Sequence, residues 1–240
     1  MKVLVACEYS GRVRDAFSAL GHDAWSCDIL PTESPGQHYI GDVRDILYDD
    51  WDLMIAHPPC TYLTGAAEWA FDDVPMIKGK PRNIKPGTLI GEERRKAREE
   101  ALEFVDLLWA APIEKVCIEN PVGVIPKFRP EMPKPQYIQQ WWFGEDASKK
   151  TGLWLRGLPE LRPTDPVEPR YVCNCGNVFE YDLGKYGCPN CCGDCGAAKQ
   201  RWGNQTDSGQ NKLPPSEDRW KIRSTTPIGI ATAMADQWSN

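Results

Sequence analysis

A cysteine directly behind a buried strand is the residue of this 240-residue chain whose type and place most suggest chemistry. The segment from Asp52 to Ala56 is short and almost continuously apolar, which is typical of a strand inside a parallel sheet. It leads into HPPCTYLT, where Pro58 and Pro59 cannot extend a strand and place Cys60 on a stiff turn at the carboxyl edge of the sheet. Ligands of open α/β sheets bind at this edge. Cys60 is either a small buried apolar residue or a nucleophile, and its position favours the nucleophile.

A second predicted strand, residues 114–121, also ends in polar residues. Its last three residues are Glu119, Asn120 and Pro121. Because the strands of a parallel sheet end at one edge, we expect the sulfur of Cys60 and the carboxyl of Glu119 to converge on one pocket.

Six of the ten cysteines lie together between residues 173 and 195, and the other four are scattered. Two pairs, Cys-x-Cys and Cys-x-x-Cys, have the spacing of zinc knuckles. They predict a structural Zn²⁺ site in a reduced compartment, with no catalytic role because four thiolates close the coordination shell. The predicted ligands are Cys173, Cys175, Cys188 and Cys191, and Cys192 with Cys195 offers a competing second pair.

The elements that must position these residues alternate between strand and helix. The pattern predicts strands at 2–7, 22–28, within 37–45, and at 52–56, 114–121 and 149–155, and helices at 12–20, 92–110 and 223–238. This alternation predicts an α/β fold with a parallel sheet. A Pro-rich linker at 159–169 and a polar segment at 198–216 flank the cysteine insert.

The first strand, turn and helix are typical of the start of a nucleotide-binding unit. The turn runs from Glu8 to Gly11, and we expect Ser10 to cap the following helix. Asp28 ends the second strand, where a carboxylate can accept two ribose hydroxyls, although a solvated turn residue is an equal alternative. Asp42 follows the third strand and could accept from an exocyclic amine.

Two further segments carry weaker signals. Residues 61–91 form a long stretch rich in Pro, Gly and Lys, which predicts a functional lid rather than a linker. The small residues Ala231, Ala233 and Ala235 of the last helix predict close approach to another element or to a ligand.

Charge and hydropathy exclude some classes of function. The net charge is −6, which argues against a non-specific nucleic-acid coat. Residues 1–110 carry 12 Lys and Arg against 19 Asp and Glu, whereas residues 111–240 carry 16 against 15, so a polyanion is expected to meet the later half. The absence of a membrane-length apolar run or a leader predicts a cytoplasmic protein without membrane contact, and we expect a monomer.

Three motifs together carry a family resemblance: PPC at one strand end, ENP at the next, and the strand Lys-Lys-Thr-Gly-Leu-Trp. With them, residues 1–160 and 216–238 resemble the DNA cytosine-5 methyltransferases, above all the compact bacteriophage type. The resemblance implies a Rossmann-like S-adenosylmethionine-dependent methyltransferase sheet with a small zinc-ribbon insert. It implies a catalytic domain at 1–160 and 216–240 and, at 161–215, the insert in place of a large target-recognition domain. For a phage-encoded protein it implies the host cytoplasm.

The resemblance also implies a mechanism. The thiolate of Cys60 would add to C6 of a cytosine flipped out of DNA, so that C5 can take the methyl group of S-adenosylmethionine. Glu119 would bind N3–H and Asn120 would hold the local geometry. Lys149 or Lys150 would stabilise the thiolate or the base O2, and the sequence leaves open which of them does so.

The cofactor contacts that the resemblance implies are Glu8, Tyr9, Ser10, Gly11, Asp28, Ile29, Asp42, Val43 and Pro58. The chain departs from the family in having fewer glycines in the first turn, an Asp rather than a Glu at the second strand end, and Thr61 where a Gln commonly follows the nucleophile.

Alternatives remain open at this stage. A related enzyme could act on RNA or on a cytidine nucleotide, and a zinc-ribbon DNA-binding protein could retain an inactive methyltransferase fold. The insert is either a reduced element that recognises the DNA groove or a structural staple. Because little chain remains for base reading, we expect short or relaxed sequence preference.

Overall fold

A computed structural model of the chain describes all residues except 66, 174, 181–197 and 240. The chain divides into two compact units, one of residues 1–137, 151–160 and 238–240 and one of residues 138–150 and 161–237. These boundaries differ from the predicted ones, because 138–150 and 216–237 group with the cysteine insert. The assignment of functional domains stays a prediction.

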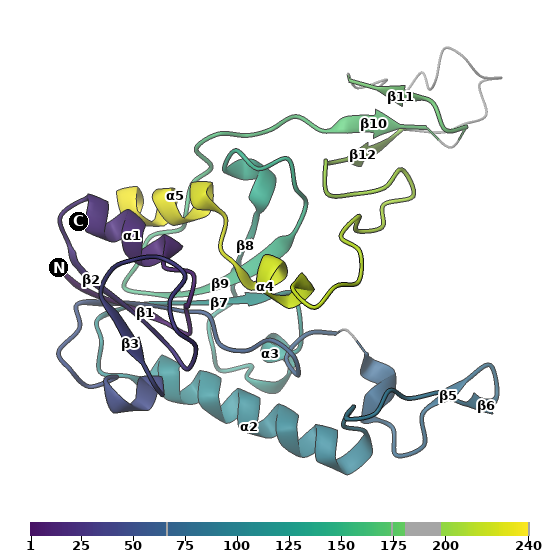
Figure 1. Ribbon diagram of the computed structural model, residues 1–240, viewed down its shortest axis with the longest axis horizontal. Coiled ribbons are helices and arrows are strands. Elements are labelled where there is room, and N and C mark those ends of the chain that lie inside the picture. Colours follow the sequence, from purple (N-terminus) through teal and green to yellow (C-terminus); the bar gives the residue numbers. More distant parts are fainter. Residues whose placement is uncertain (66, 174, 181–197, 240) are drawn as a thin grey trace. The chain divides into compact units, whose positions relative to one another are not determined.

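A seven-stranded sheet forms the centre of the first unit (Figure 1). Its order is β3-β2-β1-β4-β7-β9-β8. The strands are β1 (Lys2–Ala6), β2 (Asp23–Asp28), β3 (His38–Ile40), β4 (Leu53–Ala56), β7 (Lys115–Pro121), β8 (Gln136–Gln139) and β9 (Lys150–Arg156). The first five in this order are parallel, and β9 is antiparallel to β7. The predicted α/β fold with a mostly parallel sheet is confirmed.

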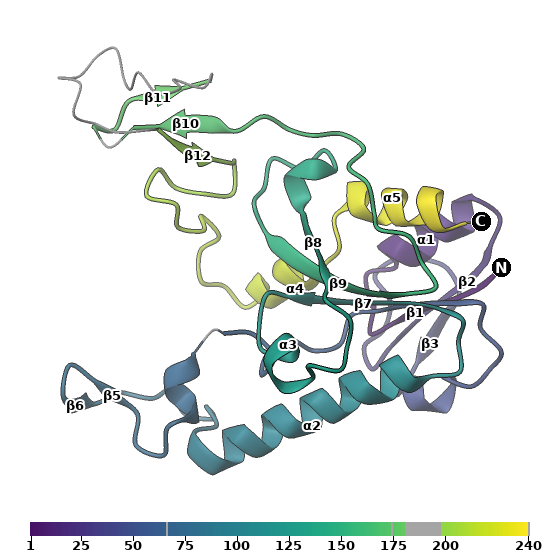
Figure 2. The same ribbon diagram turned by 180° about the vertical axis from the view of Figure 1, so that it is seen from behind.

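Helices cover both faces of the sheet, and Figures 1 and 2 show α1 (Arg12–Ala19) and α2 (Gly91–Ala110) on opposite sides. Leu4 and Met54 pack in one core cluster with Leu102 of α2. The alternate residues of β1 and β4 are buried as well. Burial on both faces explains why these strands are continuously apolar, as the sequence pattern indicated.

Several short elements were not predicted. They are η1 (Val43–Asp45), η2 (Glu68–Phe71), the antiparallel pair β5 (Met76–Ile77) and β6 (Lys80–Pro81), and α3 (Ile125–Phe128). Arg95 of α2 fixes the start of the hairpin, since its guanidinium donates to Phe71 O (2.7 Å) and to Asp73 Oδ1 (2.8 Å). The segment 61–91 therefore has structure of its own, and its role as a lid stays a prediction.

The second unit contains a small antiparallel sheet of order β11-β10-β12. Its strands are β10 (Arg170–Val172), β11 (Val178–Phe179) and β12 (Lys199–Arg201), and β12 lies within the polar segment at 198–216. Next to β12, Trp202 stacks on Trp141 of η3 (Gln140–Trp142), with 5.2 Å between ring centroids.

The predicted helix at 223–238 is two helices, α4 (Arg219–Ser224) and α5 (Ile228–Trp238). Pro227 separates them because it cannot continue a helix and excludes helical geometry at the residue before it. At the start of α5, a Cβ on Gly229 would lie 1.8 Å from Phe143 O, and Ala231, Ala233 and Ala235 further along the helix are buried. No helix among the described residues is long and apolar enough to cross a bilayer.

The zinc prediction falls largely outside the described residues. Of the four predicted ligands, Cys173 is buried and Cys175 is exposed, and Cys188 and Cys191 lie outside the described part. Next to the first pair, Gly176 N donates to Cys173 O at 3.0 Å. Among the described residues no group of three or more His, Cys, Asp or Glu could hold a metal ion, so the Zn²⁺ site stays a prediction.

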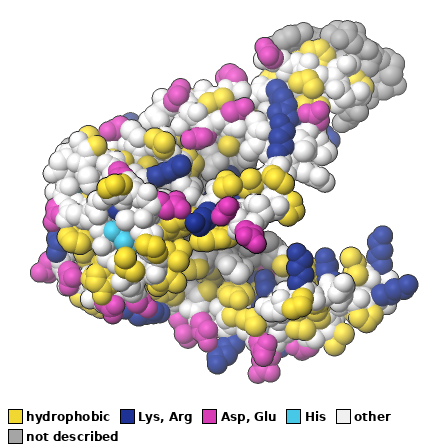
Figure 3. Space-filling model, viewed as in Figure 1, with side chains coloured by type: hydrophobic (Ala, Val, Ile, Leu, Met, Phe, Trp, Pro, Cys, Tyr) yellow, Lys and Arg dark blue, Asp and Glu magenta, His cyan; other side chains and the backbone are white. Residues whose placement is uncertain are grey.

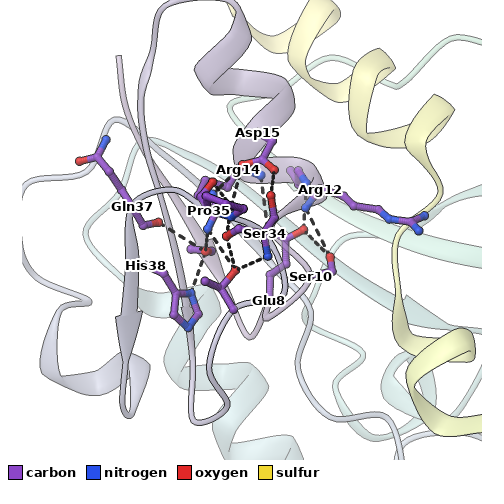
Figure 4. Close-up of polar contacts among 12 residues, drawn as sticks. Glu8, Ser10, Arg12, Arg14, Asp15, Ser34, Pro35, Gln37 and His38 are labelled. Atoms are coloured by element: carbon purple, nitrogen blue, oxygen red, sulfur yellow. Dashed lines mark hydrogen bonds and ion pairs between the residues drawn. The ribbon is translucent and has the colours of Figure 1, made fainter. Parts of the chain in front are cut away.

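Arg14 of α1 is a buried cation that the sequence pattern did not reveal (Figure 4). Its guanidinium donates to the hydroxyls of Ser26 and Thr32 and to the carbonyl oxygens of Ser34 and Pro35, at 3.0–3.3 Å. It also pairs with Asp15 at 2.7 Å. One side chain thus attaches the loop after β2 to the first helix.

Replacing Arg14 with Met should lower the free energy of unfolding by about 3–5 kcal/mol, because several buried oxygens lose their donor. Urea unfolding measures the change. Arg12→Met, at an exposed position of the same helix, is the control and should stay within about 0.5 kcal/mol of the wild type. Equal effects of the two substitutions would contradict the structural role of Arg14.

Candidate active site at the ends of β4 and β7

The candidate catalytic residues follow two neighbouring parallel strands. In the register of β4 and β7, Ala56 lies opposite Ile118, so the residues that follow both are level at the carboxyl edge. The strand order reverses between β1 and β4, and open α/β sheets bind their ligands beside such a reversal.

His57 connects the two strand ends through its side chain. Its Nδ1 lies 3.2 Å from Glu119 Oε2, and the two side chains are 9% and 20% exposed. The backbone N–H of His57 donates to Ala6 O of β1. Sequence reasoning did not single out His57, and its place just before PPC was the available signal.

Asn120 provides a second connection. Its Nδ2 donates to Pro58 O at 3.0 Å, and the residue is buried. This bond fits the predicted role of Asn120 in holding the local geometry. Its Oδ1 is buried and has no hydrogen-bond partner within the described residues.

Cys60 lies on a turn that the chain after β7 holds in place. The carbonyl oxygen of Cys60 accepts from Leu63 N (3.1 Å) and Thr64 N (3.2 Å), and Leu63 O accepts from Val124 N (2.8 Å). A Cβ on Gly123 would lie 1.9 Å from Leu63 O, so only glycine allows this approach. The thiol of Cys60 is partly exposed, as a nucleophile must be.

The two candidate lysines differ in their surroundings. Antiparallel pairing of β9 with β7 places Thr151 opposite Pro121, so Lys150, one residue earlier, begins β9 at the edge where β7 ends. Lys149 Nζ donates to Arg223 O at the end of α4 (2.8 Å). A catalytic role for either residue stays a prediction.

Glu8 and Ser10 both accept from amides at the start of α1, and Ser10 Oγ accepts from Arg12 N at 3.4 Å. The N-cap is Gly11 in a left-handed conformation (φ 74°), which makes no side-chain cap. Glu8 accepts from Val13 N (2.8 Å) and Arg14 N (3.3 Å) and from Ser10 Oγ (3.1 Å), as Figure 4 shows. A carboxylate is favoured there because the helix dipole places partial positive charge at the N-terminus.

Two more predicted cofactor residues, Asp28 and Asp42, lie at or after the ends of β2 and β3. Burial, and to a lesser extent the charges of Asp28 and Asp42, raises the pKa of the Cys7 thiol. Burial raises the pKa of Asp28, whose Oδ1 accepts from Leu30 N at 2.9 Å. Hydrogen bonds from Arg44 lower the pKa of Asp42.

The other predicted cofactor residues vary in accessibility. Ile29 is 76% exposed beside Asp28 and offers apolar surface. Val43 is buried in the core cluster, and Tyr9 is buried with its carbonyl oxygen accepting from Glu33 N. Cofactor contacts of all these residues stay predictions.

Comparison with known proteins leaves the family of this chain open. No family model matches the sequence, and no curated protein matches it. One solved structure that resembles it is a crystal structure of a protein provisionally named a DNA modification methyltransferase, encoded within a prophage of E. coli. The likeness has a TM-score of 0.40 at 14% identity over 69% of this chain, and the chain spans about half (52%) of that protein. A likeness of this size carries no argument about function, which must come from the geometry of the site.

Asn120→Ala should lower the free energy of unfolding by about 1–3 kcal/mol, because Pro58 O loses its donor. It should also loosen the turn that carries Cys60, which alkylation of the thiol by iodoacetamide measures. Asn83→Ala, at an exposed position, is the control. Wild-type stability in Asn120→Ala would contradict the role of this bond.

Asp28→Asn should raise the melting temperature at pH 7. Burial raises the folded-state pKa of Asp28, so its ionised form costs stability that returns as pH falls and the carboxyl protonates. The gain over wild type should therefore shrink toward pH 3, whereas Asp236→Asn on the exposed side of α5 should give no such pH-dependent gain. Melting curves between pH 3 and pH 8 test this, and a gain independent of pH would contradict it.

Proposed function

We propose that this chain is an S-adenosylmethionine-dependent methyltransferase that acts on C5 of cytosine in DNA through a covalent bond from Cys60 to C6. The observation that carries the proposal is that two adjacent parallel strands end in chemically active residues. The turn after β4 carries the partly exposed Cys60, and the end of β7 carries the carboxyl of Glu119. The contacts His57–Glu119 and Asn120–Pro58 hold these two ends together. The mixed α/β fold with its large, mostly parallel sheet is consistent with a methyltransferase-like protein.

The residue types suit addition to a pyrimidine. A thiolate is a strong nucleophile, and its addition to C6 builds electron density that ends on N3 and O2 of the ring. Glu119 can meet N3 with a proton, because a positioned acid stabilises charge where it develops. A cation at Lys150 would act on the thiolate or on O2.

The residues at the ends of β1, β2 and β3 fit the nucleoside part of the cofactor. A ribose diol would give hydrogen-bond donors to the partly buried Asp28 carboxyl, and the exposed Ile29 next to it would cover a base. When bound, S-adenosylmethionine supplies a methyl group on a sulfonium. Because the Glu8 carboxylate holds the amides of α1, Glu8 would shape the turn rather than bind the cofactor.

A basic surface on the β5–β6 hairpin supports DNA as the substrate. Between residues 74 and 91 the chain carries four cationic residues and no acidic one, although its net charge is −6. Figure 3 shows Lys and Arg side chains gathered in this region. Lys78, Lys80 and Lys85 are exposed, and Arg82 stacks on Trp69 at 4.2 Å. Such a cluster suits contact with phosphates.

Labelled methyl transfer from S-adenosylmethionine to duplex DNA, RNA and dCMP tests the proposal. We expect transfer to DNA by the wild type and a loss of at least about 10³-fold in Cys60→Ser, because the alkoxide of serine is a far poorer nucleophile at neutral pH. Circular dichroism of both proteins controls for folding. Full activity in Cys60→Ser would refute the covalent mechanism, and transfer only to RNA or dCMP would reassign the substrate.

DNA containing 5-fluorocytosine should trap the covalent intermediate. Fluorine at C5 does not leave as a proton does, so the adduct on Cys60 should persist in denaturing gels and in peptide mass spectrometry. An adduct that forms on a different residue would contradict the assignment of Cys60.

A further inference from the structure

His57 is a buried, titratable side chain at the candidate site to which the proposed mechanism gives no role. We propose that His57 is a positioning residue that acts through Glu119: it holds the carboxyl and shares with it the proton that Glu119 delivers to N3 of cytosine. This inference rests on the proposed function and adds to it a residue outside the PPC and ENP motifs.

The chain geometry fixes the imidazole tightly. The His57 N–H is bonded to Ala6 O of β1, and Pro58 restricts His57 to extended backbone conformations. The side chain is 9% exposed, and its Nδ1 lies 3.2 Å from Glu119 Oε2. At this distance one proton lies between the two atoms.

The surroundings of the other ring nitrogen, Nε2, decide whether a second proton of the His57–Glu119 pair lies on the imidazole or on the carboxyl. His57 Nε2 is buried and has no hydrogen-bond partner in the described part of the chain. An imidazolium would leave a charged N–H unpaired at Nε2, which is costlier to bury than a neutral one. When the pair holds two protons, the favoured form is therefore a neutral imidazole beside a protonated Glu119, and that acid is the form that can donate to N3.

The two thiols on the strands beside the pair are not the proton source. Burial raises the pKa of Cys7, which follows β1, and of Cys117 on β7, and the charge of Glu119 raises the pKa of Cys117 further. Both thiols therefore stay neutral. Cys60, after β4, must lose its own proton to attack the ring.

The proton step balances as follows on the substrate. The thiolate of Cys60 forms the S–C6 bond, and the electron pair of the C5–C6 π bond moves through the ring to N3. The O–H bond of Glu119 breaks and the N3–H bond forms, which leaves a carboxylate beside His57. After C5 has taken the methyl group, its C5–H bond breaks and the proton goes to water. Elimination then reverses the first two changes: the C5–C6 double bond re-forms, the S–C6 pair returns to sulfur and N3 returns its proton to Glu119.

The test is the pH dependence of methyl transfer to duplex DNA by His57→Asn. Asparagine can place an amide near the position of Nδ1 but holds no titratable proton, so Glu119 must carry the proton alone. We expect a loss of about 10²-fold in kcat at pH 7.5. The alkaline limb of the profile should also move at least one pH unit lower, so that activity recovers as the pH falls. His22→Asn, at a histidine bonded to Ser239, is the control and should leave the limb unmoved.

A second measurement does not depend on activity. The chain has only three histidines, so nitrogen-15 spectra of the imidazoles resolve them, and His57→Asn assigns the signal of His57. Glu119→Gln should shift the Nδ1 resonance of His57 and leave those of His22 and His38 in place. An unchanged His57 resonance would overturn the pairing.

The outcomes separate this inference from the proposed function. If the wild type is active and the alkaline limb of the His57→Asn profile coincides with that of the wild type, the role of His57 is overturned and the proposed function stands. This holds even if the rate of His57→Asn is lower. Wild type that transfers no methyl group at any pH overturns the proposed function and, with it, proton delivery by the pair.

Discussion

The hydrogen bonds between the ends of β4 and β7 are the constraint on which the candidate site depends. The pairs His57–Glu119 and Asn120–Pro58 connect side chains of one strand end to the other, and Val124 N–Leu63 O continues the connection past the turn. Because β4 is buried on both faces and ends in two prolines, neither strand end can shift alone. The turn that carries the Cys60 thiol and the strand end that carries the Glu119 carboxyl are thereby held at one edge of the sheet by direct hydrogen bonds.

A second polar arrangement lies around β1 and β2, and it holds the start of α1 and the loop after β2. Here Glu8 satisfies the amides of α1, and the buried Arg14 gathers the loop after β2. Both sets of hydrogen bonds join residues of the chain itself and fix the shape of this edge. Asp28 differs from them, because its partly buried carboxyl accepts from the backbone N–H of Leu30 and burial raises its pKa. Burying the ionised carboxyl costs stability, and a ligand with hydroxyl donors would offset that cost.

Most of the candidate catalytic residues could be found from sequence because their signals are local. Cys60 and Glu119 each follow an apolar run and adjoin prolines, and the parallel pairing of those runs is the usual consequence of strand–helix alternation. His57 and Gly123 were missed because they carry no such local signal. Their importance lies in contacts with residues about sixty positions away, and no local pattern distinguishes a strand-end histidine that meets a carboxyl from one that meets solvent.

The sequence by itself determined the α/β class, the principal strands and long helices, and the two strand ends that carry polar residues, because burial of apolar side chains dictates a period that can be read along the chain. Only the tertiary structure decided which hydrogen-bond donor meets which acceptor. It placed the Glu8 carboxylate beside Ser10 at the start of α1, divided the last helix at Pro227, and paired Glu119 with His57. Such choices depend on which donors and acceptors meet after the strands have paired, and buried polar groups must then be satisfied by whatever lies within reach.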